Sequence, residues 1–194
     1  MYKPEKPVLL VIDMQNGFLG DKSRHVIPNV VALAAECERR SIPLVFTRFH
    51  NREGSPYESL IGWRRLRTQP ETSITEELSA YSGHIIDKEF YSAFTDDFEQ
   101  LLDQHGWKTL ILCGVATESC VMKTAVDAFE RNLTPVVVSD ACASHAGTEV
   151  HNAGLMILGR FIGKDQLVTT AEFLSNYDGF AGHSRPETNS FTAG

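Results

Sequence analysis

Residues 109–120 read TLILCGVATESC, an apolar run that passes through a glycine into a polar segment ending on Cys120. An uninterrupted apolar run such as 109–113 is typical of a strand buried on both faces of a parallel sheet. We expect a helix from about Ser119 to Arg131, which places Cys120 at a strand-to-helix junction. A helix N-terminus carries partial positive charge and unpaired N–H groups. A thiol there can ionise, and the same N–H groups can hold a developing oxyanion.

Strands and helices alternate on both sides of this stretch. We expect strands and helices over the following ranges: strands 8–12, 42–47, 84–88, 135–138 and 167–169, helices 28–41, 95–104 and 148–159, and a terminal turn at 172–174. Alternation of this kind predicts right-handed βαβ units, and therefore an α/β fold with a parallel sheet covered by helices on both faces. In such sheets the ligand lies beyond the carboxyl ends of the strands.

The 194 residues are enough for one medium-sized domain. We expect that domain to span residues 1–176, with a loosely ordered tail over 177–194 that is rich in Gly, Ser, Thr and Asn. Residues 50–82 are the least regular stretch inside the domain. A segment of this length is typical of a functional loop or lid, and it equally fits a surface excursion with a short helix.

Net charge and hydropathy indicate which kinds of molecule this protein binds. The formal net charge of −7 argues against a general nucleic-acid binder, and the short basic cluster Arg64, Arg65 and Arg67 can at most meet an anionic small molecule. No run approaches the roughly 20 apolar residues of a membrane span, and the N-terminus lacks the layout of a signal peptide. The expected partner is a small-molecule substrate, with neither nucleic acid nor membrane involved.

The four cysteines show no CxxC pair and no zinc-knuckle spacing. Without a secretory signal, reduced thiols and a cytoplasmic location are the better interpretation. Cys113 lies within the apolar run and Cys37 on an apolar helix face, so both are expected to be structural. Cys142 follows the strand at 135–138 and has no visible activating group.

Three reactive side chains follow strands that are far apart in sequence. Asp13 ends the first strand, Lys88 ends the third, and Cys120 follows the fourth, so we expect them to converge on one edge of the sheet. An ammonium stabilises a thiolate, and a carboxylate nearby can take the thiol proton and return it to a leaving amine. Each also fits a structural role: a small buried cysteine, a turn-forming aspartate and a solvated lysine. Their joint placement favours catalysis.

Three motifs carry a resemblance to a known family. They read VIDMQNGF at 11–18, DKEFYSAF at 87–94, and GVATESCV at 114–121 followed by TAVDA at 124–128. In this order they resemble the isochorismatase-like cysteine hydrolases, a family that includes nicotinamidases, N-carbamoylsarcosine amidase, ureide and biuret hydrolases, and isochorismatase. The resemblance extends from about residue 7 to residue 174.

The resemblance implies a three-layer α-β-α, Rossmann-type fold with a six-stranded, mainly parallel sheet and an Asp13–Lys88–Cys120 triad. It also implies a cis peptide bond between Val115 and Ala116, which would aim the N–H groups of Ala116 and Cys120 at the substrate oxygen. It further implies assembly as a homodimer or homotetramer.

The sequence departs from the zinc-binding members of that family. Those members carry Asp-x-His after the second strand and a further histidine downstream. Here the matching stretch is Thr47-Arg48-Phe49-His50, and segment 64–78 holds no histidine. One imidazole beside a guanidinium is a poor site for a divalent cation, so we expect no metal and no cofactor.

Several residues are candidates for contacting the substrate. Phe18, Phe90 and Tyr91 suit a pocket wall, Thr117 lies beside the proposed oxyanion donors, and His50 suits either a substrate contact or loop packing. Arg48, Arg64 and Arg65 suit the binding of carboxylate or ureide oxygens, and each also suits a solvated surface.

These observations favour a cofactor-free cysteine hydrolase that cleaves a C–N bond of a small amide, ureide or carbamoyl compound through a thioester. Asp13 would act as general base, Cys120 as nucleophile and Lys88 as the group that orients the charges. Two alternatives stay open. One is vinyl-ether hydrolysis of an isochorismate-like substrate, which needs a proton donor such as Asp13 and no thiolate. The other is a non-catalytic binding protein on the same scaffold.

Overall fold

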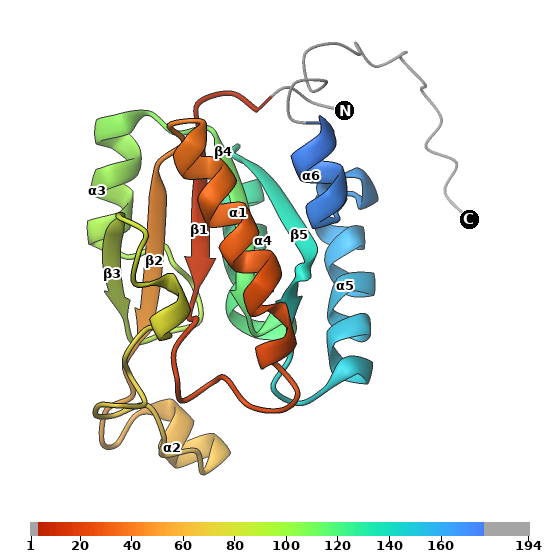
Figure 1. Ribbon diagram of the computed structural model, residues 1–194. Coiled ribbons are helices and arrows are strands. Elements are labelled where there is room, and N and C mark those ends of the chain that lie inside the picture. Colours follow the sequence, from red (N-terminus) through yellow and green to blue (C-terminus); the bar gives the residue numbers. More distant parts are fainter. Residues whose placement is uncertain (1–3, 177–194) are drawn as a thin grey trace.

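A computed structural model describes residues 4–176, and within them six strands form one parallel sheet. The sheet order is β3-β2-β1-β4-β5-β6. The strands span Pro7–Ile12 (β1), Leu44–Phe49 (β2), His84–Lys88 (β3), Thr109–Val115 (β4), Thr134–Ala143 (β5) and Leu167–Val168 (β6). The predicted α/β fold is confirmed, because neighbouring strands are parallel and are joined through helices that cover both faces of the sheet (Figure 1).

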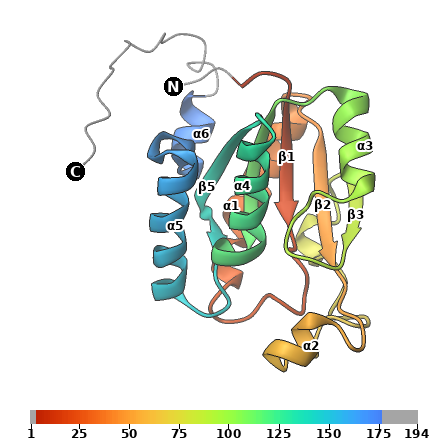
Figure 2. The same cartoon turned by 180° about the vertical axis from the view of Figure 1, so that it is seen from behind.

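Helices lie on both faces of this sheet. One face is covered by α1 (Ile27–Arg39) and α6 (Thr170–Asn176). The other is covered by α3 (Asp96–His105), α4 (Met122–Glu130) and α5 (Thr148–Ile162), which Figure 2 shows from behind. Short 3-10 turns at Arg24–Val26 and Lys164–Gln166 lead into α1 and β6.

Alternation along the central strands divides the core in two. Leu9 and Val11 of β1 pack with the α1 side, whereas Leu10 and Ile12 pack with the α3–α4–α5 side. All four are at most 1% exposed. This two-sided burial is the reason that the strands read as continuous apolar runs rather than as alternating patterns.

Several boundaries differ from the predicted ones. β2 begins and ends two residues later than 42–47, and α6 is a full helix where a turn was expected at 172–174. β5 continues five residues past Val138, because Ser139 and Asp140, the polar pair expected to end the strand, form hydrogen bonds to residues of β6 and α6. Ser139 donates a hydrogen bond to the Val168 carbonyl (3.0 Å), and Asp140 accepts one from the Thr170 N–H (2.7 Å).

The segment 50–82 contains α2 (Pro56–Ile61) and a 3-10 turn at Glu76–Leu78. Ser55 caps α2 through its side chain, and Gly62 ends the helix in the left-handed conformation at φ +72°. Figure 1 shows α2 beyond the carboxyl ends of β1 and β2. The segment therefore contains regular secondary structure and lies at the edge of the sheet where a ligand is expected.

The C-terminal tail proposed for residues 177–194 lies outside the described residues. Among residues 4–176, no helix combines the length and apolar character that crossing a bilayer requires.

Candidate active site

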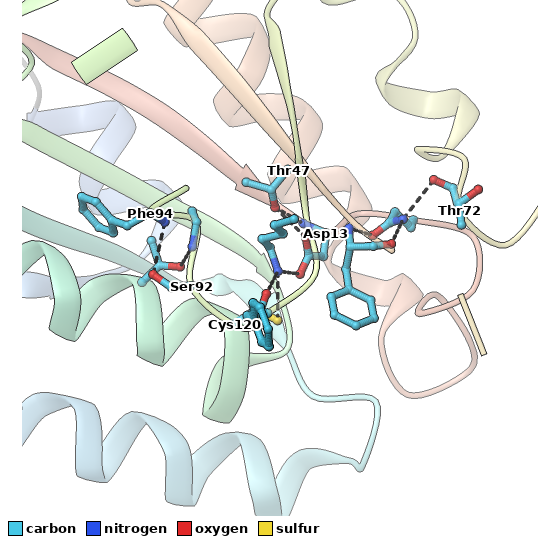
Figure 3. A network of polar contacts seen from close by, with 12 residues as sticks. Asp13, Thr47, Thr72, Ser92, Phe94 and Cys120 are labelled. Carbon is cyan, nitrogen blue, oxygen red and sulfur yellow. Dashed lines mark hydrogen bonds and ion pairs between the residues drawn. The ribbon is translucent and has the colours of Figure 1, made fainter. Parts of the chain in front are cut away.

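The structure brings Asp13, Lys88 and Cys120 together at the carboxyl edge of the sheet. Nζ of Lys88 lies 2.7 Å from Oδ2 of Asp13 and 3.5 Å from Sγ of Cys120. Figure 3 shows Asp13 and Cys120 pointing toward this common centre from different segments. The Lys88 ammonium also donates to the Phe90 carbonyl at 3.0 Å. The three groups are therefore joined by direct polar contacts, although they come from separate parts of the sequence: the residue after β1, the end of β3 and the turn after β4.

Asp13 occupies an unusual backbone position immediately after β1. Its φ is +48°, a region that aspartate tolerates better than most residues. The Thr47 hydroxyl donates a hydrogen bond to Oδ1 of Asp13 at 2.6 Å, which leaves Oδ2 for Lys88. The carboxylate is therefore held from both sides, and the Asp13–Lys88 pair is fully buried.

The thiol of Cys120 does not ionise as readily as its position at a helix start suggests. The pKa of Cys120 is raised to about 12: burial is the largest cause, the charge of Asp13 adds to it, and Lys88 offsets it only in part. This corrects the expectation of a lowered thiol pKa, since removal from water outweighs the helix N-terminus and the ammonium. Burial also disfavours the charged form of Lys88, but its interactions with Asp13 and Cys120 raise the pKa of Lys88 overall.

The Cys120 segment is a π-helical turn, Thr117–Val121, that precedes α4. The predicted helix over 119–131 is therefore split, and the N–H groups of Ser119 and Val121 both reach the Ala116 carbonyl, at 3.1 and 3.2 Å. The peptide bond between Val115 and Ala116 is cis. π-helical turns of this kind are frequent at functional sites.

Close packing against β1 fixes where β4 ends. Gly114 has φ +115°, and a Cβ at this position would lie 2.1 Å from the Ile12 carbonyl oxygen. Only glycine permits this approach. The end of β4, and with it the Cys120 turn, therefore lies tightly beside the end of β1 that carries Asp13.

A pocket of about 210 Å³ opens over Cys120. Its wall is mostly aromatic and is made by Phe18, Phe49, Tyr57, Ile61, Trp63, Tyr91, Ala116, Glu118, Ser119, Cys120 and His145. Phe18 stacks on Trp63 with ring centroids 5.7 Å apart, and Phe49 meets Tyr57 edge-on at 5.0 Å. The pocket can therefore enclose a small molecule whose reacting atom contacts Sγ of Cys120.

Gln15 ties the 50–82 segment to the site. Its side-chain amide donates to the carbonyls of Phe49 (3.0 Å) and Thr72 (2.9 Å), and its oxygen accepts from the Phe49 N–H (2.7 Å). Figure 3 shows Thr72 at the end of this network. Gln15 is fully buried. Two of its hydrogen bonds hold Phe49 at the end of β2, and the third, to Thr72, links that strand end to the segment that supplies Tyr57 and Trp63 to the pocket wall.

The predicted substrate contacts are only partly at the pocket. Phe18 and Tyr91 line it, whereas Arg48 and His50 do not. Arg48 pairs with both oxygens of Asp87 at 2.7 Å, and Nε2 of His50 lies 3.0 Å from Oδ1 of the same residue. Side chains alternate along a strand, so Arg48 and Asp87 face away from the side that carries Thr47, Phe49 and Lys88.

Thr117 and the other candidates also lie away from the pocket. The Thr117 hydroxyl lies 2.7 Å from Nδ1 of His151, and its side chain is fully buried. Phe90 is 57% exposed and is not among the lining residues. Arg64 pairs with Glu58, and Arg65 with Glu71.

Several pocket residues were not among the predicted ones, including Phe49, Trp63 and His145. Phe49 had a usable signal, because it lies two residues after Thr47 on the strand face that turns toward the site. Trp63 and His145 lie in segments without a periodic pattern, so sequence alone does not orient them.

Within residues 4–176, no group of three or more His, Cys, Asp or Glu side chains is placed to share a metal ion. His50 and Asp87 are in contact, but the Arg48 guanidinium already pairs with that carboxylate through two hydrogen bonds.

The chain is similar to known proteins in both sequence and fold. The isochorismatase domain model matches residues 7–164. Nicotinamidase 3 of Arabidopsis thaliana is 31% identical over 77% of this chain and 79% of its own length. Enterobactin synthase component B of Escherichia coli is 29% identical over 89% of this chain, which spans only 64% of that protein. The crystal structure of an isochorismatase-like hydrolase from Alkaliphilus metalliredigens, 26% identical, superimposes with a TM-score of 0.79 over 89% of this chain and 100% of that one.

The family match covers most of the chain, and it includes the strand ends that carry Asp13, Lys88 and Cys120. The protein is therefore an isochorismatase-family hydrolase and belongs to the isochorismatase domain family.

Proposed function

We propose that this protein is a cysteine hydrolase that cleaves a C–N bond of a small amide, ureide or carbamoyl compound. The observation that carries the proposal is the contact of Lys88 Nζ with both Asp13 and Cys120, beneath an aromatic pocket. Similarity to a nicotinamidase supports the amide class. No cofactor takes part in this proposal.

The first half of the reaction forms a thioester. The thiol is protonated at rest because burial raises its pKa, so Asp13 takes the proton as Sγ attacks the carbonyl carbon. The carbonyl π electrons move to the oxygen, and the backbone N–H groups of Ala116 and Cys120 stabilise that oxyanion. As the C–N bond breaks, Asp13 returns the proton to the leaving nitrogen. Ammonia or an amine departs, and the acyl group stays on Cys120.

The second half of the reaction returns the enzyme to its starting state. Asp13 takes a proton from water, the resulting hydroxide attacks the thioester carbonyl, and the C–S bond breaks. Asp13 passes the proton that it took from water to the thiolate of Cys120, and an acid is released. Lys88 keeps its positive charge throughout, because Asp13 and Cys120 carry the negative charge that moves beside it.

The test is ammonia release from a panel of primary amides, ureides and carbamoyl amino acids. We expect wild-type turnover of at least one member and its loss in Cys120→Ala, with the melting temperature retained. Full activity in that variant would contradict the proposal. It would instead favour the vinyl-ether alternative, in which Asp13 is the proton donor and no thiol is needed.

Self-association as a homodimer or homotetramer and a cytoplasmic location belong to the same proposal. Helix α5 supports the first, because its apolar side chains Val150, Met156, Ile157 and Phe161 are exposed. The four cysteines support the second, because all are free thiols, as is usual in a reducing compartment.

A further inference from the structure

Two buried side-chain oxygens within residues 4–176 have no hydrogen-bond partner: the Tyr57 hydroxyl and Oε2 of Glu118. They come from distant parts of the chain, α2 and the π-helical turn, yet both residues line the pocket over Cys120. A buried polar group without a partner weakens a fold, and native structures keep few of them. Their occurrence in one pocket wall points to a partner that arrives with the ligand.

Tyr57 is held over the reactive centre by its neighbours. Its ring packs edge-on against Phe49 at 5.0 Å and against Tyr91 at 5.2 Å. Burial raises the pKa of the Tyr57 phenol, and the neighbouring Tyr91, Cys120 and Asp13 raise it further. The group therefore stays protonated and offers an O–H donor close to the nucleophile.

Glu118 lies two residues before the nucleophile, and one of its oxygens is already held. Oε1 accepts a hydrogen bond from the Ser144 hydroxyl at 2.8 Å. Helix α5 packs directly on this residue, since a Cβ on Gly154 would lie 3.1 Å from Cβ of Glu118. The carboxylate is thus oriented by protein contacts, and Oε2 keeps its capacity to accept.

The pocket wall contains an acidic side chain and, among its described residues, no lysine or arginine. Of the described residues that line the pocket, Glu118 is the only Asp, Glu, Lys or Arg. The Lys88 ammonium lies below Cys120 with a fully buried side chain and already contacts Asp13. Among the described residues, no lysine or arginine of the wall would offset a negative charge on the ligand.

We propose that Glu118 and Tyr57 determine substrate specificity, an inference that rests on the proposed hydrolase function. Oε2 of Glu118 accepts a hydrogen bond from a substrate N–H, and the Tyr57 hydroxyl donates one to a substrate acceptor. Each side chain shifts slightly to meet the ligand. Because both oxygens are buried and have no partner among the described protein atoms, these bonds break no hydrogen bond within the protein. The pocket then takes neutral or positively charged amides and rejects those that carry a carboxylate, which would face Glu118 as a like charge.

Three probes of similar shape test this: benzamide, 4-(aminomethyl)benzamide and 4-carbamoylbenzoate. Their dissociation constants are measured by calorimetry on Cys120→Ala protein, in which no turnover disturbs binding. We expect the carboxylate probe to bind at least about tenfold more weakly than benzamide. The Glu118→Gln substitution, which keeps the acceptor for Ser144, should bring the two within about threefold. The Glu89→Gln substitution, at a carboxylate paired with Arg52 away from the pocket, should leave the ratio unchanged.

Any of three results would overturn the inference: equal or tighter binding of the carboxylate probe, no binding of any probe, or an unchanged ratio in Glu118→Gln.

The Tyr57→Phe substitution adds an independent readout. We expect weaker benzamide binding with an unchanged or higher melting temperature, because an unpaired hydroxyl is removed. A lower melting temperature with unchanged binding would show a structural hydroxyl instead. If the probes bind in the expected order while the wild-type protein hydrolyses no amide, the proposed function fails and the binding preference stands.

Discussion

The Thr47 hydroxyl holds Asp13 at two points. It donates to Oδ1 of the carboxylate at 2.6 Å and accepts from the backbone N–H of the same residue at 3.1 Å. One side chain on β2 therefore sets both the backbone and the carboxylate of the proposed general base on β1. Both residues are buried, so water offers no substitute for either bond.

The Thr47→Val substitution should slow catalysis without changing the shape of the core. It removes both contacts and leaves the carboxylate short of a donor, which costs about 1–3 kcal/mol. We expect kcat to fall about tenfold or more, with a smaller effect on KM, and the pH–rate profile to shift. The Thr47→Ser substitution keeps the hydroxyl and should restore most of kcat. Equal kcat values for the two variants would show that the hydroxyl does not position Asp13.

The Lys88→Met substitution should destabilise the fold far more than breaking a surface ion pair. It leaves the fully buried Asp13 carboxylate without its cation, which costs about 3–5 kcal/mol. The matched control is Arg24→Met, because the Arg24–Glu77 pair is largely exposed and is worth about 0–1 kcal/mol. Urea denaturation of both variants measures the difference. Similar losses in the two variants would mean that the Lys88–Asp13 pair is not buried in solution.

Alkylation of Cys120 by iodoacetamide should be slow at neutral pH and should accelerate as the pH rises. The thiolate is the reacting form, and burial raises the pKa of Cys120 to about 12. Below that pKa the thiolate fraction increases about tenfold per pH unit. Mass spectrometry of the Cys120 peptide between pH 7 and about 9.5 follows this reaction, with Cys120→Ser as the blank. A rate that levels off below about pH 8 would indicate an ionised thiol in the resting protein.

The Gly114→Ala substitution should be strongly destabilising. The added Cβ would lie 2.1 Å from the Ile12 carbonyl oxygen, and the φ of +115° is strained for any other residue. We expect a loss of about 3 kcal/mol or more, since packing and backbone both suffer. Gly20→Ala is the matched control, because nothing lies within 4 Å of its Cβ position. Thermal unfolding compares them, and a Gly114→Ala protein as stable as the control would contradict this packing of β4 on β1.

Much of the fold was predictable, because strands that are buried on both faces of a sheet have continuous apolar sequences. The strand at His84–Lys88 has the predicted bounds, and Thr95 caps α3 as expected. The prediction was less accurate where a polar residue has a distant partner. Ser139 reads as the end of a strand, and only its contact with Val168 shows why β5 continues.

The candidate active site also has features that the sequence predicts and features that it does not. That Asp13, Lys88 and Cys120 meet follows from parallel topology, since each ends or follows a strand. The position of the Arg48 side chain does not follow from the topology. Because side chains alternate along β2, Arg48 points toward Asp87 and away from the pocket. Tyr57 and Glu118 are equally ordinary in sequence, and their unpaired oxygens are visible only once their neighbours are known.

The order of apolar runs and polar strand ends, by itself, determined that this chain folds as a parallel α/β sheet and presents a carboxylate, an amine and a thiol at one edge. The tertiary structure alone decided how far that thiol is from ionising, which aromatic rings enclose it and which buried oxygens lack a protein partner. The physical reason is that strand alternation and desolvation depend on what lies across space, and local sequence carries no record of those neighbours.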